Sequence, residues 1–172
     1  MTDPLRAFIV GGGIAGCVAA LALRQRGHEV VLAEQRADIA GIGHGITVQG
    51  NALKAFDSVG VFQKIAERGF PFGHLRMRSA DGHVIAEIPT PPMGGPDLPP
   101  TMGALRSDIA DVLAEEIVAA GKARPVTIAI DVMQADAARA IAEAAERGLG
   151  HIDILINNAG IMLPRTVIEV TD

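Results

Sequence analysis

The most constraining feature of the chain is a glycine-rich turn at Gly11–Gly16, which stands between two segments of different character. The residues before the turn, 5–10, form a short apolar run that is typical of a buried strand. The residues after the turn, 14–26, have helical composition, and a second β-branched strand is predicted over 29–33. A strand, a tight turn, a helix and a second strand, in that order, begin a parallel α/β sheet.

Three glycines of this turn have the spacing of a dinucleotide-binding site. Gly11 permits the tight turn, Gly13 lets the backbone approach a pyrophosphate, and Gly16 allows the helix to pack closely on the strand. The backbone N–H groups of Ile14 and Ala15, at the positive end of the helix dipole, would attract the phosphates. The turn therefore predicts a site for a dinucleotide.

Glu34 follows the second predicted strand, 18 residues after Gly16. A carboxylate at this place would accept hydrogen bonds from an adenosine ribose and would disfavour a 2′-phosphate, which makes NADP a poor fit. The alternative is a turn that merely packs tightly, with Glu34 as a solvated charge. Cys17, just inside the helix, is interpreted as a small packing residue rather than a redox thiol.

The rest of the chain alternates between helical, extended and glycine- or proline-rich segments. The residues that we expect to start helices are Asn51 and Ser107, as N-caps, and a hairpin is expected around Asp81-Gly82. The full set of expectations is a loop at 40–50, helices at 51–59, 61–67, 107–120 and 135–146, hairpin strands at 75–79 and 83–88, a proline-rich loop at 89–100, strands at 126–130 and 152–156, and the beginning of a helix or loop at 167–172.

Four apolar strands are predicted to end at polar or glycine residues on one edge of a common sheet. We expect a Rossmann-like, doubly wound parallel sheet in which 152–156 returns beside 5–10 and 126–130 lies outside 29–33, with the β-hairpin as a small insertion. Residues 1–172 would then form a single α/β dinucleotide-binding domain.

Composition excludes several other classes of function. The net charge is −5 without a long basic run, which argues against nucleic acid, and no apolar run reaches the length of a membrane span. The single cysteine and the scattered histidines give no disulfide and no recognised metal-ligand spacing. We therefore expect a soluble, cytoplasmic protein with no metal.

The first part of the chain, 1–121, resembles the N-terminal part of FAD-dependent aromatic hydroxylases, the class A flavin monooxygenases related to p-hydroxybenzoate and salicylate hydroxylases. Besides the glycine turn, the resemblance rests on the segments 43–53 and 105–109 and on the Asp81-Gly82 hairpin. It implies that FAD is the cofactor. In the implied site the ADP half is held by the three glycines and Glu34, Arg36 lies near the adenosine, and Arg106 contacts the flavin side.

The last part, 122–172, resembles the middle of a short-chain dehydrogenase/reductase. This resemblance rests on Asp131-Val132 and on the sequence Asn157-Asn158-Ala159-Gly160 after a strand. It implies that Asp131 and Val132 lie against an adenine, and that a nucleotide site has a floor shaped by Asn158, Ala159 and Gly160.

Both resemblances favour an FAD-binding, oxidoreductase-like protein of monooxygenase ancestry, with a small aromatic substrate. We expect it to be incomplete for catalysis, because the later Gly-Asp motif of the hydroxylases and the Ser and Tyr-x-x-x-Lys of the dehydrogenases are not in the sequence, which contains no tyrosine. The alternatives are an NAD-binding dehydrogenase remnant and a non-catalytic fused or truncated module. A homo-oligomer or a partner chain that completes the site stays open.

Overall fold

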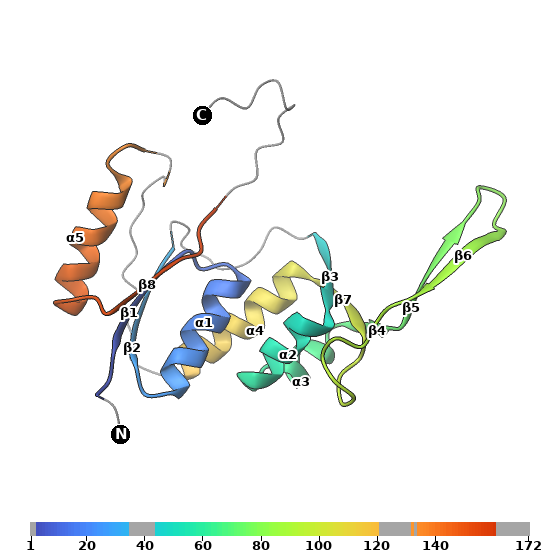
Figure 1. Ribbon diagram of the computed structural model, residues 1–172, viewed down its shortest axis with the longest axis horizontal. Coiled ribbons are helices and arrows are strands. Elements are labelled where there is room, and N and C mark those ends of the chain that lie inside the picture. The colour runs from blue at the N-terminus through green and yellow to red at the C-terminus, as the bar shows by residue number, and fades with distance from the viewer. Residues whose placement is uncertain (1–2, 35–43, 121–131, 133, 161–172) are drawn as a thin grey trace.

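The computed structural model describes residues 3–34, 44–120, 132 and 134–160 (Figure 1). The predicted strand at 126–130 and the predicted element at 167–172 lie outside these residues. Within them the chain is an α/β structure that contains the expected parallel sheet, which confirms the predicted fold class.

The parallel sheet consists of β1 (Arg6–Val10), β2 (Glu29–Ala33) and β8 (Ile154–Asn157) in the order β2-β1-β8. The central strand pairs in parallel with both neighbours, so that Phe8 lies between Val31 and Leu155. This confirms the expectation that the last predicted strand returns beside the first. All three strands end at the same edge of the sheet, where ligands of doubly wound folds bind.

Helices cover both faces of this sheet (Figure 1). On one face α1 (Ile14–Gln25) and α4 (Arg106–Ala119) pack over the side chains of Ala7 and Ile9, in the larger apolar core. On the other face α5 (Ala137–Leu149) covers Phe8, in a smaller cluster. This division follows from the strand period of two, which sends alternate side chains of β1 to opposite faces.

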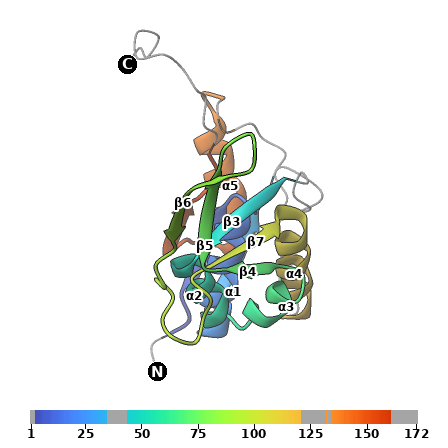
Figure 2. The ribbon, with the colours of Figure 1, turned by 90° about the vertical axis from the view of Figure 1, so that its right-hand side faces the viewer.

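A second, antiparallel sheet lies on the far side of α1 and α4 (Figures 1 and 2). Its central strand is β7 (Thr101–Leu105), which pairs with β3 (Gly45–Gln49) and β4 (Phe70–Phe72). The expectation of a loop over 40–50 is wrong at β3, because Ile46 and Val48 alternate with polar residues and turn toward the core. The two remaining helices are α2 (Gly50–Ser58) and α3 (Phe62–Ala66).

The predicted helix caps are wrong, although the helices are present. Helix α2 has Gln49 as its N-cap residue and α4 has Leu105, and neither cap side chain forms a hydrogen bond to its helix. Asn51 and Ser107 lie inside the first turns instead. The physical reason is that β3 and β7 run directly into the helices, so that the extended last residue of each strand takes the cap position.

The predicted hairpin is confirmed as β5 (His74–Arg78) and β6 (Val84–Pro89). Gly82 in its turn has φ of +92°, a left-handed conformation that favours glycine. The hairpin projects away from the rest of the molecule (Figure 1). Of the helices in the described part of the chain, none is long and apolar enough to cross a bilayer.

Candidate nucleotide-binding site

The glycine turn leaves β1 at Gly11 and enters α1 at Gly13. Gly11 has φ of +104°, and its N–H donates to the carbonyl oxygen of Ala33 at 2.8 Å. A Cβ atom placed on Gly11 would lie 2.7 Å from the backbone nitrogen of Ala159. Gly11 is therefore required both by its backbone conformation and by the close approach of the residues that follow β8.

Gly16 and Gly13 differ in what surrounds them. A Cβ atom on Gly16 would lie 2.0 Å from the carbonyl oxygen of Gly11, which is the close contact of helix and turn that the sequence predicts. Among the described residues, a Cβ atom on Gly13 would meet nothing nearer than 3.9 Å, the distance to Nδ2 of Asn158. The backbone at Gly13 is thus open to a ligand.

The N-terminus of α1 has no side-chain cap within the described residues. Gly13 is the N-cap residue, no side chain caps the helix, and the first turn contains no acidic residue. The first-turn N–H groups, among them those of Ile14 and Ala15, and the positive end of the helix dipole therefore face the edge of the sheet without an anionic partner from a cap. This is the electrostatic environment that a phosphate group needs.

Glu34 lies directly after β2, and its carboxylate reaches the turn. Its Oε2 atom accepts a hydrogen bond of 2.7 Å from the N–H of Gly12, in a partly buried position. The structure thus brings Glu34 and the three glycines together as the sequence predicts, while its contact with a ribose stays a prediction.

The residues that follow β8 reach the same turn from the other side. The N–H groups of Asn158 and Ala159 both donate to the carbonyl oxygen of Val10, at 3.0 and 2.7 Å. The side-chain Nδ2 of Asn158 donates to the carbonyl oxygen of Gly11 at 3.0 Å. Gly160 is exposed, with no atom within 4 Å of its Cβ position.

Of the residues predicted to lie against the adenosine or adenine through the resemblances, the structure describes Val132 besides Glu34. Val132 is 44% exposed. Arg36 and Asp131 lie outside the described residues. Their contacts with an adenosine or adenine stay predictions.

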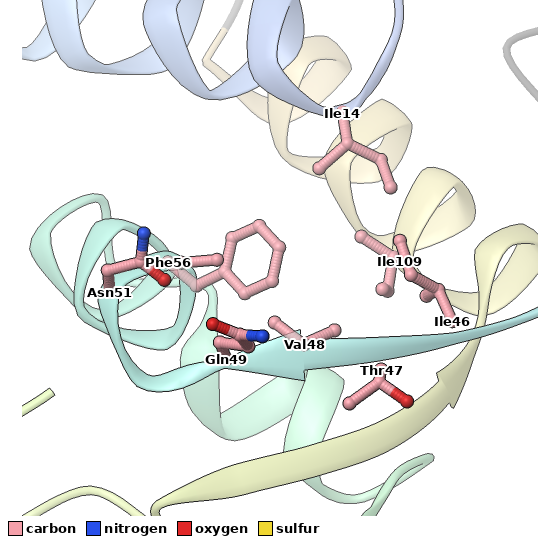
Figure 3. Close-up of a pocket in the computed structure, with 9 residues that line it drawn as sticks. Ile14, Ile46, Thr47, Val48, Gln49, Asn51, Phe56 and Ile109 are labelled. Atoms are coloured by element: carbon pink, nitrogen blue, oxygen red, sulfur yellow. The ribbon is translucent and has the colours of Figure 1, made fainter. Parts of the chain in front are cut away.

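A pocket of about 270 Å³ opens beside the start of α1 (Figure 3). Ile14 points into it from α1, Phe56 from α2 and Ile109 from α4. Strand β3 also lines the pocket, with Thr47 and Gln49 alternating along the strand with apolar residues. The full lining is Ile14, Ile46, Thr47, Val48, Gln49, Asn51, Ala52, Phe56 and Ile109. None of the site residues predicted from the sequence belongs to β3. The period-two alternation over Ile46–Gln49 is the signal that would have placed a strand, and hence these side chains, here.

Arg106 is the first residue of α4 and is exposed. Its backbone N–H donates to the carbonyl oxygen of His44 at 3.1 Å, which joins the start of α4 to the start of β3. Arg106 precedes Ile109 by three residues, a spacing that puts both on one side of the helix. Arg106 therefore begins the helix that forms one wall of the pocket.

Cys17 is fully buried, and its thiol donates to the carbonyl oxygen of Gly12 at 3.2 Å. Burial, and secondarily the nearby negative charge of Glu34, raises the pKa of the Cys17 thiol to about 11. The thiol therefore stays protonated near neutral pH, which fits a packing role. Within the described residues, no group of three or more His, Cys, Asp or Glu side chains is arranged to hold a metal ion.

Two family models match different parts of the chain. Residues 9–60 match an NAD(P)-binding Rossmann-like domain, which spans the glycine turn and Glu34. Residues 102–172 match a short chain dehydrogenase, which spans β7, α4, α5 and β8.

Known proteins of similar sequence include hydroxylases and an FAD-dependent monooxygenase. A 3-hydroxybenzoate 6-hydroxylase of Polaromonas naphthalenivorans (strain CJ2) is 41% identical over 87 residues, which is 50% of this chain and 22% of that protein. The 3-hydroxybenzoate 6-hydroxylase of Klebsiella oxytoca is 40% identical over 91 residues, which is 52% of this chain and 23% of that protein. The tetrameric 2-methyl-3-hydroxypyridine-5-carboxylic acid oxygenase has a similar structure, with a TM-score of 0.59 and 24% identity, over 70% of this chain and 30% of its own.

The chain thus spans less than a third of the length of each of these relatives. The likeness in structure, at this identity, is a likeness of fold. Together with the dehydrogenase match they identify the two parts. The first two thirds of the chain resemble the N-terminal part of FAD-dependent aromatic hydroxylases, and the last third resembles the short-chain dehydrogenases.

Proposed function

We propose that this chain binds FAD and forms the cofactor-binding part of an oxidoreductase of the aromatic-hydroxylase type. The observation that carries the proposal is the open backbone at Gly13, directly beside the uncapped N-terminus of α1. A pyrophosphate fits there, because it needs both close backbone approach and unpaired N–H donors.

The two ends of an FAD molecule have separate places on either side of this turn. On the β2 side, Glu34 lies where a carboxylate accepts hydrogen bonds from the adenosine ribose, and this anion opposes the 2′-phosphate of NADP. Toward the second sheet, the pocket beside Ile14 offers mostly apolar walls with Gln49 and Asn51 as polar groups. A flat aromatic ring requires such a lining.

The residues of the chain would bind and orient the cofactor. The N–H groups at the start of α1 would hold the pyrophosphate, Glu34 the ribose, and Arg106 would supply positive charge at the flavin side. When bound, FAD supplies the redox chemistry, with NAD(P)H as reductant and oxygen as oxidant for an aromatic substrate. The apolar side chains of the pocket between α1 and β3 would shield the ring from water.

We further propose that residues 1–172 form a single domain, with a hydroxylase-like part over 1–121 and a dehydrogenase-like part over 122–172 that completes the parallel sheet. The pairing of β8 with β1 supports this division. The dehydrogenase-like part also makes NAD the second candidate ligand, because Asn158 and Ala159 lie against the glycine turn.

The test is a titration of the purified protein with FAD and with NAD, followed by flavin fluorescence or, for NAD, by calorimetry. The chain contains no Trp or Tyr, so its own fluorescence does not interfere with that of the flavin. We expect FAD to bind more tightly than NAD. Tighter binding of NAD would reverse the assignment of the cofactor, and no binding of either would refute the proposed function.

The variant Gly13→Ala tests where the ligand binds. We expect a loss of FAD affinity of roughly tenfold or more, because a methyl group would occupy the space that the pyrophosphate needs. Gly27→Ala is the matched control, since Gly27 follows the opposite end of α1 and has nothing within 4 Å of its Cβ position. Equal affinities for both variants would show that the ligand does not approach the turn.

A further inference from the structure

Asn158 lies where the dehydrogenase-like part of the chain meets the hydroxylase-like glycine turn. We propose that Asn158 is a positioning residue for this turn, so that the last third of the chain holds the phosphate-binding backbone of the first part in its binding conformation. This inference rests on the proposed function, because its consequence for binding concerns the same nucleotide site.

The contact is a side-chain hydrogen bond to the first glycine of the motif. Nδ2 of Asn158 donates to the carbonyl oxygen of Gly11 at 3.0 Å, in a partly buried position. The same carbonyl oxygen is what a Cβ atom on Gly16 would strike, and Nδ2 of Asn158 would lie 2.9 Å from that Cβ atom. Asn158 therefore touches the place where the turn and the first turn of α1 pack together.

The turn is held from both neighbouring strands. On the β2 side, Ala33 accepts a hydrogen bond from Gly11 N–H, and Glu34 accepts one from Gly12 N–H. On the β8 side, Asn158 donates to the oxygen of Gly11. The peptide groups that enter the turn are thus fixed through both their N–H and their C=O atoms, which leaves Gly13 as the first residue directed toward a ligand.

The position of Asn158 is itself fixed, because β8 is tied to β1 at both of its ends. Before the strand, Oδ2 of Asp153 accepts a hydrogen bond of 2.7 Å from Arg6 N–H. Nη1 of Arg6 also lies 2.8 Å from Nδ1 of His151. After the strand, the N–H groups of Asn158 and Ala159 share the carbonyl oxygen of Val10. A shift in register, which would withdraw the amide from Gly11, would break all of these bonds.

Fixing the turn in advance has a consequence for binding. A turn that already has its binding conformation does not lose conformational freedom when the ligand arrives, whereas a loosened turn does, and affinity falls by that amount. The loss concerns the pyrophosphate, which FAD and ADP share. Removal of the Asn158 amide should therefore weaken both ligands by the same factor, roughly fivefold, as expected for one hydrogen bond.

The experiment compares Asn158→Ala and Asn158→Asp with the wild-type protein. Asn158→Ala should lose affinity for FAD and for ADP equally. The aspartate has nearly the shape of asparagine but replaces the donor with an acceptor and adds a negative charge, so Asn158→Asp should lose at least as much affinity for both ligands. In the ligand-free protein, amide hydrogen exchange should also be faster, by roughly fivefold, at Gly11 and Gly12, whose N–H groups are hydrogen-bonded.

The control is Gln25→Ala, which deletes a bond of the same chemistry far from the site. Nε2 of Gln25 donates to the carbonyl oxygen of Val59 at 2.9 Å, also in a partly buried position. This variant should melt at a temperature lowered by about 2–4 °C, like Asn158→Ala, but should keep its affinity for both ligands and its slow exchange at the turn.

The outcomes separate this inference from the proposed function. Unchanged affinity and unchanged exchange in both Asn158 variants, with a wild-type protein that binds FAD, would overturn the role of Asn158 alone. A larger loss for FAD than for ADP would also overturn it, because it would mean direct contact with the flavin. A wild-type protein that binds neither ligand would refute the proposed function, whereas the exchange rates at Gly11 and Gly12 would still decide whether Asn158 holds the turn.

Discussion

Glycine positions around α1 provide a quantitative test of the structure, because three of them differ in one property at a time. Gly13 has an ordinary φ of −68° and open space around its Cβ position. Gly27 has equally open space but a φ of +85°. Gly16 lies inside the helix, and its Cβ position is 2.0 Å from a backbone oxygen. Substitution of each by alanine therefore separates the cost of space from the cost of backbone conformation.

The expected losses in free energy of unfolding follow from these three environments. Gly13→Ala should cost less than about 1 kcal/mol, the usual effect of a poorer N-cap residue. Gly27→Ala should cost about 1–2 kcal/mol, because alanine disfavours the left-handed conformation. Gly16→Ala should cost the most. Ordinary contact begins near 3.4 Å, so the helix must move by more than 1 Å from the Gly11 carbonyl.

Overpacking of this kind costs about 1–3 kcal/mol or more, and the gain of about 1 kcal/mol from replacing glycine by alanine in a helix offsets only part of it. We therefore expect a net loss of about 2 kcal/mol or more for Gly16→Ala. Urea denaturation followed by far-ultraviolet circular dichroism measures all three variants, since the chain has no Trp to report by fluorescence. If Gly16→Ala is as stable as Gly13→Ala, the close packing of α1 on the turn is wrong.

Two further predictions concern the Cys17 thiol and the hydrogen bond between Asp153 and Arg6, which secures β8 against β1. The pKa of Cys17 is raised to about 11 by burial, so as pH rises from about 9 the thiol of the unfolded chain loses its proton before that of the folded chain does. Stability should therefore fall between about pH 9 and 11, by roughly 2–3 kcal/mol, and this fall should be absent from the Cys17→Ala variant; parallel pH profiles for the two proteins would contradict the buried thiol. Asp153→Ala should lower the free energy of unfolding by about 1 kcal/mol, because it leaves the N–H of Arg6 without its carboxylate partner. Asp97→Ala, at an exposed position in the proline-rich loop, is the control in urea denaturation, and equal stability of these two variants would mean that the Asp153 carboxylate does not secure β8.

The elements that the sequence predicts well are those whose signals are local. The turn at Gly11–Gly16, the strands on either side of α1 and the Asp81-Gly82 hairpin each depend on residues within a few positions of one another. The period of the apolar residues and the conformational freedom of glycine are enough to place them. The position of β8 beside β1 was expected from the place of this segment in the two families that the chain resembles, and right-handed parallel connections are compatible with it.

The elements that the sequence misses depend on contacts between distant residues. Strand β3 contains glycine near its start and was expected to be a loop, and it becomes a strand because Ile46–Gln49 pair with 101–104 of β7. Asn51 and Ser107 do not cap their helices for the same reason, because the residues two positions before them pair in that sheet and take the cap positions. Two polar side chains that line the pocket, Thr47 and Gln49, come from this strand, and so that part of the site was not predicted.

The hydroxylase-like and dehydrogenase-like parts of the chain are in contact at the glycine turn. Neither the glycine turn nor the Asn-Asn-Ala-Gly sequence predicts the other, yet Gly11 lacks a side chain where Ala159 approaches, and its carbonyl oxygen faces the amide of Asn158. A parallel sheet imposes this proximity, because the ends of adjacent parallel strands meet at one edge and the turn after the central strand lies between its neighbours. A neighbouring strand fits beside the turn if the residues that follow the strand are small and can donate a hydrogen bond to the turn. The requirement at this position is therefore one of shape and hydrogen bonding, which the dehydrogenase-like sequence meets.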